Sequence, residues 1–252
     1  MKRIIPILTV IILAAGCKKD KNITPNPQPG VTKKLVHIQE VEYPANDITF
    51  TYDAQGRMKT SETSSFLSTY DYKGSTVDYT GFLKTENRVY SSAVLTLNNN
   101  GLATSMDYTY HPTAITTKHY DYTYQYDVAG NLTKAETQQN PGLQTILLEW
   151  ANGNISKETY ATNNNPTAYW IFTYGNDLDK TGLNRHFTLY SNGLGGNFSK
   201  NLHTKAEKYN ANNVKVDEEI NSFEFDTEGY LLKKTSYWQQ SNTTEHYIYT
   251  YK

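Results

Sequence analysis

The chain has 252 residues, with 24 basic and 25 acidic side chains and a formal net charge of −1 at pH 7. A protein that neutralises phosphates shows a basic face or stripe, and this sequence shows none, so we do not expect nucleic acid as a partner. Cys17 is the single cysteine, which excludes a disulfide within the chain.

Residues 1–16 have the pattern of a secretory signal peptide. Lys2 and Arg3 precede an apolar run from Ile4 to Ala15, and small residues stand just before Cys17. The run is shorter than the ~20 apolar residues that a helix needs to span a bilayer. We therefore expect this segment to be removed rather than kept as a membrane helix.

The stretch LAAGC at residues 13–17 resembles the lipobox of bacterial lipoproteins. In that family the cysteine thiol receives a diacylglycerol, and the cysteine becomes the new N-terminus and carries acyl chains such as palmitate. The resemblance implies that Cys17 is the lipid-attachment residue. Lys18 and Lys19 follow it where inner-membrane retention would show an acidic residue, so the resemblance also implies outer-membrane localisation, with the periplasmic face and the cell surface both open. A free, buried cysteine is the alternative.

Residues 17–31 read as the lipidated cysteine and a flexible tether. The segment is polar and holds Pro25, Pro27 and Pro29, which favours an extended chain. Each buried acyl methylene contributes about 0.8 kcal/mol, so a multiply acylated Cys17 would hold the protein at a membrane without a spanning segment. Residues 32–252 are enough for a single all-β domain.

Four segments of that domain share an aromatic residue, a short polar turn with glycine, and an apolar residue. They are residues 50–63, 124–137, 148–159 and 223–236. In three of them an aspartate stands three residues before the glycine, as in Asp53 and Gly56, which predicts a type I turn followed by a glycine bulge. Asn152-Gly153 instead predicts a two-residue type I′ turn. Each segment is therefore expected to be a β-hairpin.

The turn types also predict which residues face each other across the strands. In all four hairpins an aromatic residue is expected opposite an aliphatic one, a stabilising cross-strand pair: Tyr52 with Met58, Tyr126 with Leu132, Phe225 with Leu231, and Trp150 with Ile155. The next pairs are expected to be Phe50 with Thr60, Tyr124 with Lys134, Leu148 with Lys157, and Phe223 with Lys233. In this register lysine stems would cover rings such as Tyr124.

The whole domain is predicted to be all-β. Short alternating segments separated by turns, with no helical period after Gly30, indicate an antiparallel meander of strands five to ten residues long. The abundance of Tyr and Thr over Leu, Val and Ile favours a large curved sheet or open barrel, with its rings on the concave side. Gly175 to Lys200 alternates poorly and is the predicted long loop.

The first hairpin carries a family resemblance. Its sequence FTYDAQGRMKT resembles the YD repeat of Rhs-type shell proteins, Tyr-Asp-x-x-Gly-Arg-Leu, with Met58 in place of leucine. Asn131, Asn154 and Tyr230 replace the arginine in the other copies. With the signal peptide and tether, the chain more closely resembles bacterial cell-envelope lipoproteins of unknown function described as having a porin-like β fold. Those motifs specify turns and contain no catalytic residues.

The sequence predicts no catalytic residues, no metal site and no cofactor. Its histidines are dispersed, and His119 with Asp121 reads as a solvated pair on one strand face. Two acidic groups, Asp177 with Asp179 and residues 217–219, could supply calcium ligands or glycosidase carboxylates. We interpret the first as a solvated loop and the second as an exposed strand start.

The candidate ligand-facing aromatics are Tyr120, Tyr122, Trp170 and Trp238. Tyr120 and Tyr122 lie farther from their turn than Tyr124 and are expected to face Gln138 and Glu136. The leading hypothesis is a lipid-anchored, non-enzymatic envelope lipoprotein that binds or scaffolds a partner, either a glycan or an envelope protein. A secreted glycan-degrading enzyme is the second hypothesis, and a membrane-embedded β-barrel is the third.

Overall fold

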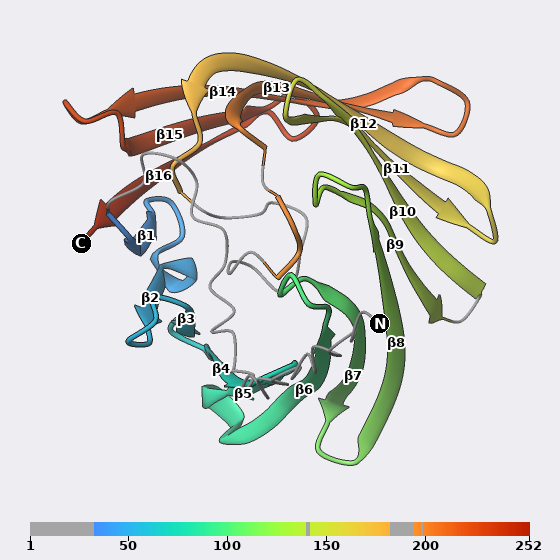
Figure 1. Cartoon of the computed structure of the whole chain (residues 1–252). Coiled ribbons are helices and arrows are strands. Elements are labelled where there is room, and N and C mark those ends of the chain that lie inside the picture. The colour runs from blue at the N-terminus through green and yellow to red at the C-terminus, as the bar shows by residue number, and fades with distance from the viewer. Residues whose placement is uncertain (1–32, 140–141, 182–193, 198) are drawn as a thin grey trace, which may run out of the picture.

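A computed structural model describes residues 33–139, 142–181, 194–197 and 199–252 of the chain. Sixteen antiparallel strands of this part follow one another in chain order, and β1 pairs with β16, so the sheet closes into a barrel (Figure 1). The predicted all-β antiparallel meander is confirmed. Of the two predicted shapes, a curved sheet and an open barrel, the barrel is formed, and it is closed.

The strands alternate with short turns and two single 3-10 turns, Pro44–Asn46 and Lys84–Glu86. Their bounds are β1 Leu35–Glu40, β2 Ile48–Tyr52, β3 Met58–Glu62, β4 Phe66–Lys73, β5 Thr76–Leu83, β6 Arg88–Leu97, β7 Ala103–Thr113, β8 Thr116–Tyr126, β9 Leu132–Gln139, β10 Gly142–Ala151, β11 Asn154–Thr162, β12 Asn165–Leu178, β13 Asn201–Asn210, β14 Lys215–Phe225, β15 Leu231–Trp238 and β16 Thr243–Tyr251.

The predicted turns and the first pair of each hairpin are confirmed. The Asp53 carboxylate accepts the backbone N–H groups of Gln55 and Arg57, and Gly56 has a left-handed φ of 80°. Asp127 and Asp226 accept backbone N–H groups in the same way. The observed pairs are Tyr52 with Met58, Tyr126 with Leu132, Phe225 with Leu231 and Trp150 with Ile155.

The predicted second pair of each hairpin is wrong. A β-bulge directly after the first pair adds one residue to the second strand, so every later partner moves on by one position. The residues found opposite Phe50, Tyr124, Leu148 and Phe223 are Ser61, Ala135, Glu158 and Lys234. Lys134 lies opposite Gln125 instead and does not cover the Tyr124 ring as predicted.

Alternate residues of each strand face the barrel interior. In β6 the inward positions include Ala93, Leu95 and Leu97, which are buried, whereas Val94 and Thr96 between them are exposed. Tyr70 and Tyr79 are also buried, and their ring centroids lie 5.5 Å apart. The inner face therefore holds the apolar and aromatic core, as predicted for the concave side.

Five side-chain hydrogen bonds join neighbouring strands at one end of the barrel. Each donor is an aromatic residue in the last third of a strand, and each acceptor is the backbone carbonyl of the first or second residue of the preceding strand. The bonds are Tyr52 to Leu35 at 2.6 Å, Tyr72 to Met58 at 3.1 Å, Tyr126 to Ala103 at 2.8 Å, Trp150 to Leu132 at 2.7 Å and Tyr174 to Ile155 at 2.8 Å. We call these five donors the aromatic collar. Three of the five donors, Tyr52, Tyr126 and Trp150, are the residues directly before or one position before a repeat turn, so the hairpin repeat supplies turns and also part of the collar.

The collar end also receives the segment after β12. Strand β12 continues to Leu178, so the predicted loop from Gly175 begins too early, and residues 182–193 and 198 lie outside the described part. The Leu194 carbonyl accepts the Ala103 N–H at 2.8 Å, and the Asn197 N–H donates to the Gly130 carbonyl at 3.0 Å. Lys34 pairs with Lys252 at the same end. The described part of the chain therefore begins at the collar end.

Candidate functional site

A row of tyrosine rings lines the inner face of β7 and β8. The ring centroids of Tyr108 and Tyr120 lie 6.3 Å apart, as do those of Tyr108 and Tyr122, and those of Tyr122 and Tyr124 lie 6.5 Å apart with nearly parallel planes. Tyr124 is buried and Tyr122 is half-buried. Burial raises the pKa of both phenols, so both are neutral hydrogen-bonding groups at physiological pH.

A cavity of about 280 Å³ lies beside this row, bounded by β8, β9, β10 and β11. Its lining includes three tyrosine rings, two carboxamides and a threonine hydroxyl: Tyr122, Tyr124, Tyr160, Gln139, Gln144 and Thr137. We call this space the tyrosine cavity. Its volume lies near the lower limit of typical ligand pockets, about 300 Å³.

The Thr137 hydroxyl is a buried polar group of the cavity that can still accept or donate a hydrogen bond. The residue is 7% exposed, and its buried hydroxyl makes no hydrogen bond of standard geometry to any described residue, although it lies close enough to Tyr122 to influence that phenol. Gln144 accepts a hydrogen bond from Thr162 at 2.9 Å through its carbonyl oxygen, which leaves its amide nitrogen as a donor. Buried polar groups are normally satisfied by protein, water or ligand. The cavity can therefore exchange several hydrogen bonds with a small polar molecule.

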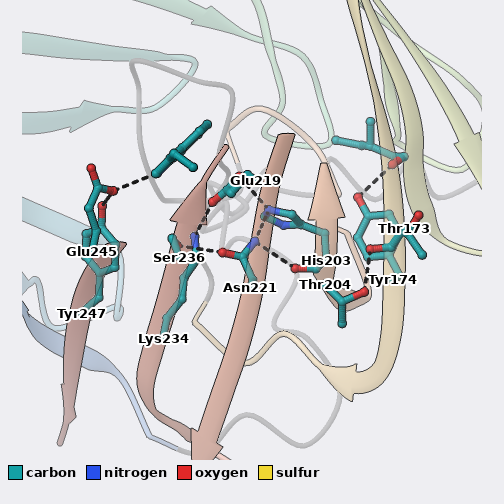
Figure 2. A network of polar contacts seen from close by, with 12 residues as sticks. Thr173, Tyr174, His203, Thr204, Glu219, Asn221, Lys234, Ser236, Glu245 and Tyr247 are labelled. Carbon is teal, nitrogen blue, oxygen red and sulfur yellow. Dashed lines mark hydrogen bonds and ion pairs between the residues drawn. The ribbon is translucent and has the colours of Figure 1, made fainter. Parts of the chain in front are cut away.

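A second group of polar side chains lies inside β13, β14 and β15 (Figure 2). The Glu219 carboxylate, whose side chain is 2% exposed, lies 3.0 Å from Lys234 Nζ and 3.3 Å from His203 Nε2. Asn221 Nδ2 lies 2.9 Å from His203 Nε2, and the Ser236 hydroxyl donates to Asn221 Oδ1 at 2.7 Å. We call these five residues the interior polar cluster. Its members bond to one another, which suits a structural role.

The tryptophans predicted to face a ligand meet inside the barrel. The ring centroids of Trp170 and Trp238 lie 6.4 Å apart at nearly a right angle. Trp238 Nε1 donates to Glu245 at 3.0 Å, and the Tyr247 hydroxyl donates to the same carboxylate oxygen at 2.7 Å. Both tryptophans are half-buried. The indole N–H of Trp238 is bonded to Glu245, and the Trp170 ring also has Lys208 Nζ 5.5 Å from its centroid, so the protein already occupies part of both rings.

Comparison with known proteins identifies the architecture. No family model matches the chain, and a search of curated proteins found no match. A solved porin-like protein from Bacteroides uniformis superposes with a TM-score of 0.67, covering 90% of this chain and 100% of that chain at 14% sequence identity. The fold is porin-like. A porin-like protein from Bacteroides vulgatus gives a TM-score of 0.61, covering 87% of this chain and 99% of that chain at 8% identity.

Within this porin-like fold, the predicted ligand-facing residues form two separate groups. Tyr120 and Tyr122 belong to the tyrosine row, and only Tyr122 lines the tyrosine cavity. The expected partner of Tyr122 is wrong, because Tyr122 lies opposite Thr137 rather than Glu136. The pairing of β8 with β9 begins at Tyr122, and Tyr120 is paired with Tyr108 on the other side, in β7. Trp170 and Trp238 form the other group.

Sequence reasoning missed the non-aromatic lining of the cavity. Thr137, Gln139 and Gln144 are brought beside Tyr122 by strand pairing, as the pairs of Thr137 with Tyr122 and with Gln144 show. No sequence motif marks these three residues. The bulge in β9 next to the Tyr126–Leu132 pair also reverses the face on which alternation from the turn would place the later residues of β9. The available signal was the alternation in β9, where Ala135, Thr137 and Gln139 share one face.

The described part of the chain brings together no group of three or more His, Cys, Asp or Glu side chains that could hold a metal ion.

The two acidic groups of the sequence differ in their surroundings. Asp177 is exposed and Asp179 accepts two hydrogen bonds from Thr181. Of residues 217–219, predicted to be an exposed strand start, Asp217 and Glu218 are half-buried, and the prediction is wrong for Glu219, which is buried in the interior polar cluster. None of the helical segments in the described residues is long and apolar enough to cross a membrane.

Proposed function

We propose that the protein is a non-enzymatic envelope lipoprotein, anchored in the outer membrane by acylated Cys17, whose barrel is surrounded by water and binds a glycan in its interior. The proposal combines the sequence pattern of residues 1–31 with the distribution of side chains on the two faces of the barrel. It assigns the anchoring to the lipid and the recognition to the barrel.

The observation that carries the proposal is the charge on the outer face. One row crosses five neighbouring strands, β10 to β14, through residues paired side by side. Its members are Glu149, Lys157, Ile171, Glu207 and Glu218. On the lipid face of a membrane barrel, a lysine costs about 2–4 kcal/mol at the bilayer midplane. Four charged residues in a row of five therefore favour water around these strands.

Ion pairs on the outer face support the same interpretation. Lys157 lies 3.3 Å from Glu149, Lys205 lies 3.1 Å from Glu207, and Lys134 lies 2.8 Å from Glu136. Exposed apolar residues such as Ile171 are interspersed with these pairs and do not form the continuous apolar band of a membrane barrel. The third hypothesis of the sequence analysis, a membrane-embedded barrel, is therefore not the one we adopt.

The inner face supports recognition of a glycan. Sugar rings present C–H faces that pack on aromatic rings and hydroxyls that both donate and accept hydrogen bonds, and the interior offers tyrosine faces with amide and hydroxyl groups beside them.

A glycan-array screen tests the proposal directly, using a truncated chain beginning at Gly30 that retains all sixteen strands. We expect binding to at least one glycan class without release of a hydrolysis product. Absence of binding across the array would contradict glycan recognition, and turnover of a bound glycan would contradict the non-enzymatic assignment.

A further inference from the structure

We propose that the tyrosine cavity is the glycan site and that it takes one neutral sugar ring, with the Tyr122 ring against the sugar face and Thr137 and Gln144 bonded to its hydroxyls. This inference deepens the proposed function and rests on it, because it assigns the recognition of a glycan to one cavity and one ligand chemistry.

The size of the cavity limits the ligand. A volume of about 280 Å³ lies just below the range of roughly 300–1,000 Å³ in which drug-sized ligands bind. The space therefore suits a single ring rather than an extended oligosaccharide. A longer glycan would enter with its terminal residue only.

The charges around the cavity favour a neutral ligand. Among the described lining residues Glu136 is the one acidic or basic residue, and its carboxylate lies on the outer face, where it is 2.8 Å from Lys134 Nζ. Glu219 and Lys234 bond to each other on β14 and β15, away from the lining residues. A charged ligand would lose water without gaining an opposite charge, which is unfavourable in a buried site.

The polar groups of the cavity favour a ligand with hydroxyls. The buried Thr137 hydroxyl can donate and accept, and Gln144 has an amide nitrogen left to donate after its bond from Thr162. A purely apolar molecule would offer no hydrogen bond to the Thr137 hydroxyl or to the Gln144 amide nitrogen, which is unfavourable in a largely buried site. A sugar hydroxyl can serve both groups, while the ring of Tyr122 contacts the C–H face.

The position of the cavity gives the ligand a way in from outside. Gln139 is the last residue of β9 and Gly142 the first of β10, so the hairpin that contributes Gln139 and Gln144 turns at the end opposite the aromatic collar. The first described strand begins at the collar end, where Lys34 lies beside Lys252. A glycan chain would therefore approach from the end opposite the one at which the first described strand begins.

The test measures binding of neutral monosaccharides to the full chain by saturation-transfer NMR and calorimetry. The panel is glucose, galactose, mannose and N-acetylglucosamine, with glucuronate as the charged comparison. Three variants are compared with the parent chain: Tyr122→Ala, Thr137→Val, and Thr123→Val as the matched control. Thr123 lies on the neighbouring position of β8 but is exposed on the opposite face. Thermal unfolding of each variant verifies that the barrel is retained.

We expect at least one neutral sugar to bind and glucuronate to bind more weakly. Thr137→Val should weaken the affinity about five- to tenfold, the effect of one lost hydrogen bond, and Thr123→Val should leave it unchanged. Tyr122→Ala should remove detectable binding. If a sugar binds equally to all folded variants, the site assignment is overturned while the proposed function survives. If the glycan array and the panel both give no binding, the proposed function fails and this inference fails with it.

Discussion

Replacing Tyr126 by phenylalanine tests whether the aromatic collar stabilises the barrel. The Tyr126 hydroxyl donates to the Ala103 carbonyl at 2.8 Å and lies 3.2 Å from the Leu194 carbonyl. Phenylalanine keeps the ring that packs opposite Leu132 but removes the donor. The substitution therefore isolates the hydrogen bond from the packing.

The expected loss follows from the burial of the bond. A typical intramolecular hydrogen bond contributes about 1 kcal/mol, and a buried acceptor left without its donor costs about 1–3 kcal/mol. The Ala103 residue is 2% exposed, so water reaches its carbonyl poorly in the folded barrel. We expect Tyr126→Phe to lower the free energy of unfolding by about 2 kcal/mol, equivalent to roughly 4–8 °C in Tm for a domain of this size.

Urea denaturation followed by circular dichroism measures this difference. Tyr209→Phe is the matched control, because the Tyr209 ring stacks on Tyr169 with centroids 5.0 Å apart and its hydroxyl makes no hydrogen bond among the described residues. The control should leave the unfolding free energy within about 0.5 kcal/mol of the parent. Equal stability of Tyr126→Phe and Tyr209→Phe would refute the stabilising role of the collar.

Three further predictions concern charge and pH. Burial raises the pKa of Tyr52 to about 12, so the stability contributed by its neutral phenol is complete below the unfolded pKa near 10 and is lost as the pH rises through 12. In an absorbance titration, the tyrosinate signal of Tyr52 should therefore appear above pH 10 and together with unfolding. Titration of all tyrosines near pH 10 would contradict this. Lys234→Met should lower the free energy of unfolding, measured by urea denaturation, by about 3 kcal/mol because buried Glu219 loses its lysine partner. Adding Glu219→Gln should restore most of that loss, and a double variant as unstable as Lys234→Met would contradict the role of the pair. The backbone N–H of Asn131 holds the pKa of Asp127 below its ordinary value of 3.8, so the stability that the ionised carboxylate contributes is present above pH 3.8 and is lost as the pH falls through the folded pKa. The Asp127→Asn variant should therefore lose less stability than the parent chain between pH 5 and 2. Equal slopes of unfolding free energy against pH for the two proteins would contradict this prediction.

The local part of the fold could be predicted from the sequence. The Asp-x-x-Gly and Asn-Gly turns fix backbone geometry over four or five residues, so the first cross-strand pair, such as Tyr52 with Met58, follows from the turn alone. The second pair could not be predicted in this way. The bulge residue Lys59 carries no special side chain, and a shift of one position changes every later partner. Closure of the barrel depends on pairing of β1 with β16, which no local pattern encodes.

The candidate site could be predicted only in part. Alternating tyrosines marked Tyr122 as an inward ring, but Thr137 and Gln144 come from two other strands and meet it only through the register of β8, β9 and β10. Glu219 was assigned to an exposed strand start because acidic residues cluster there in the sequence. Its burial depends on Lys234 and His203, which lie 15 and 16 residues away along the chain.

The central claim is that the barrel is held at the membrane by its N-terminal lipid while its outer face contacts water. Fractionation of cells expressing the parent chain and Cys17→Ala, without detergent, tests this claim most directly. We expect the parent chain in the membrane pellet and the folded Cys17→Ala variant in the soluble fraction. A folded Cys17→Ala variant that stays in the membrane pellet until detergent is added would contradict the account.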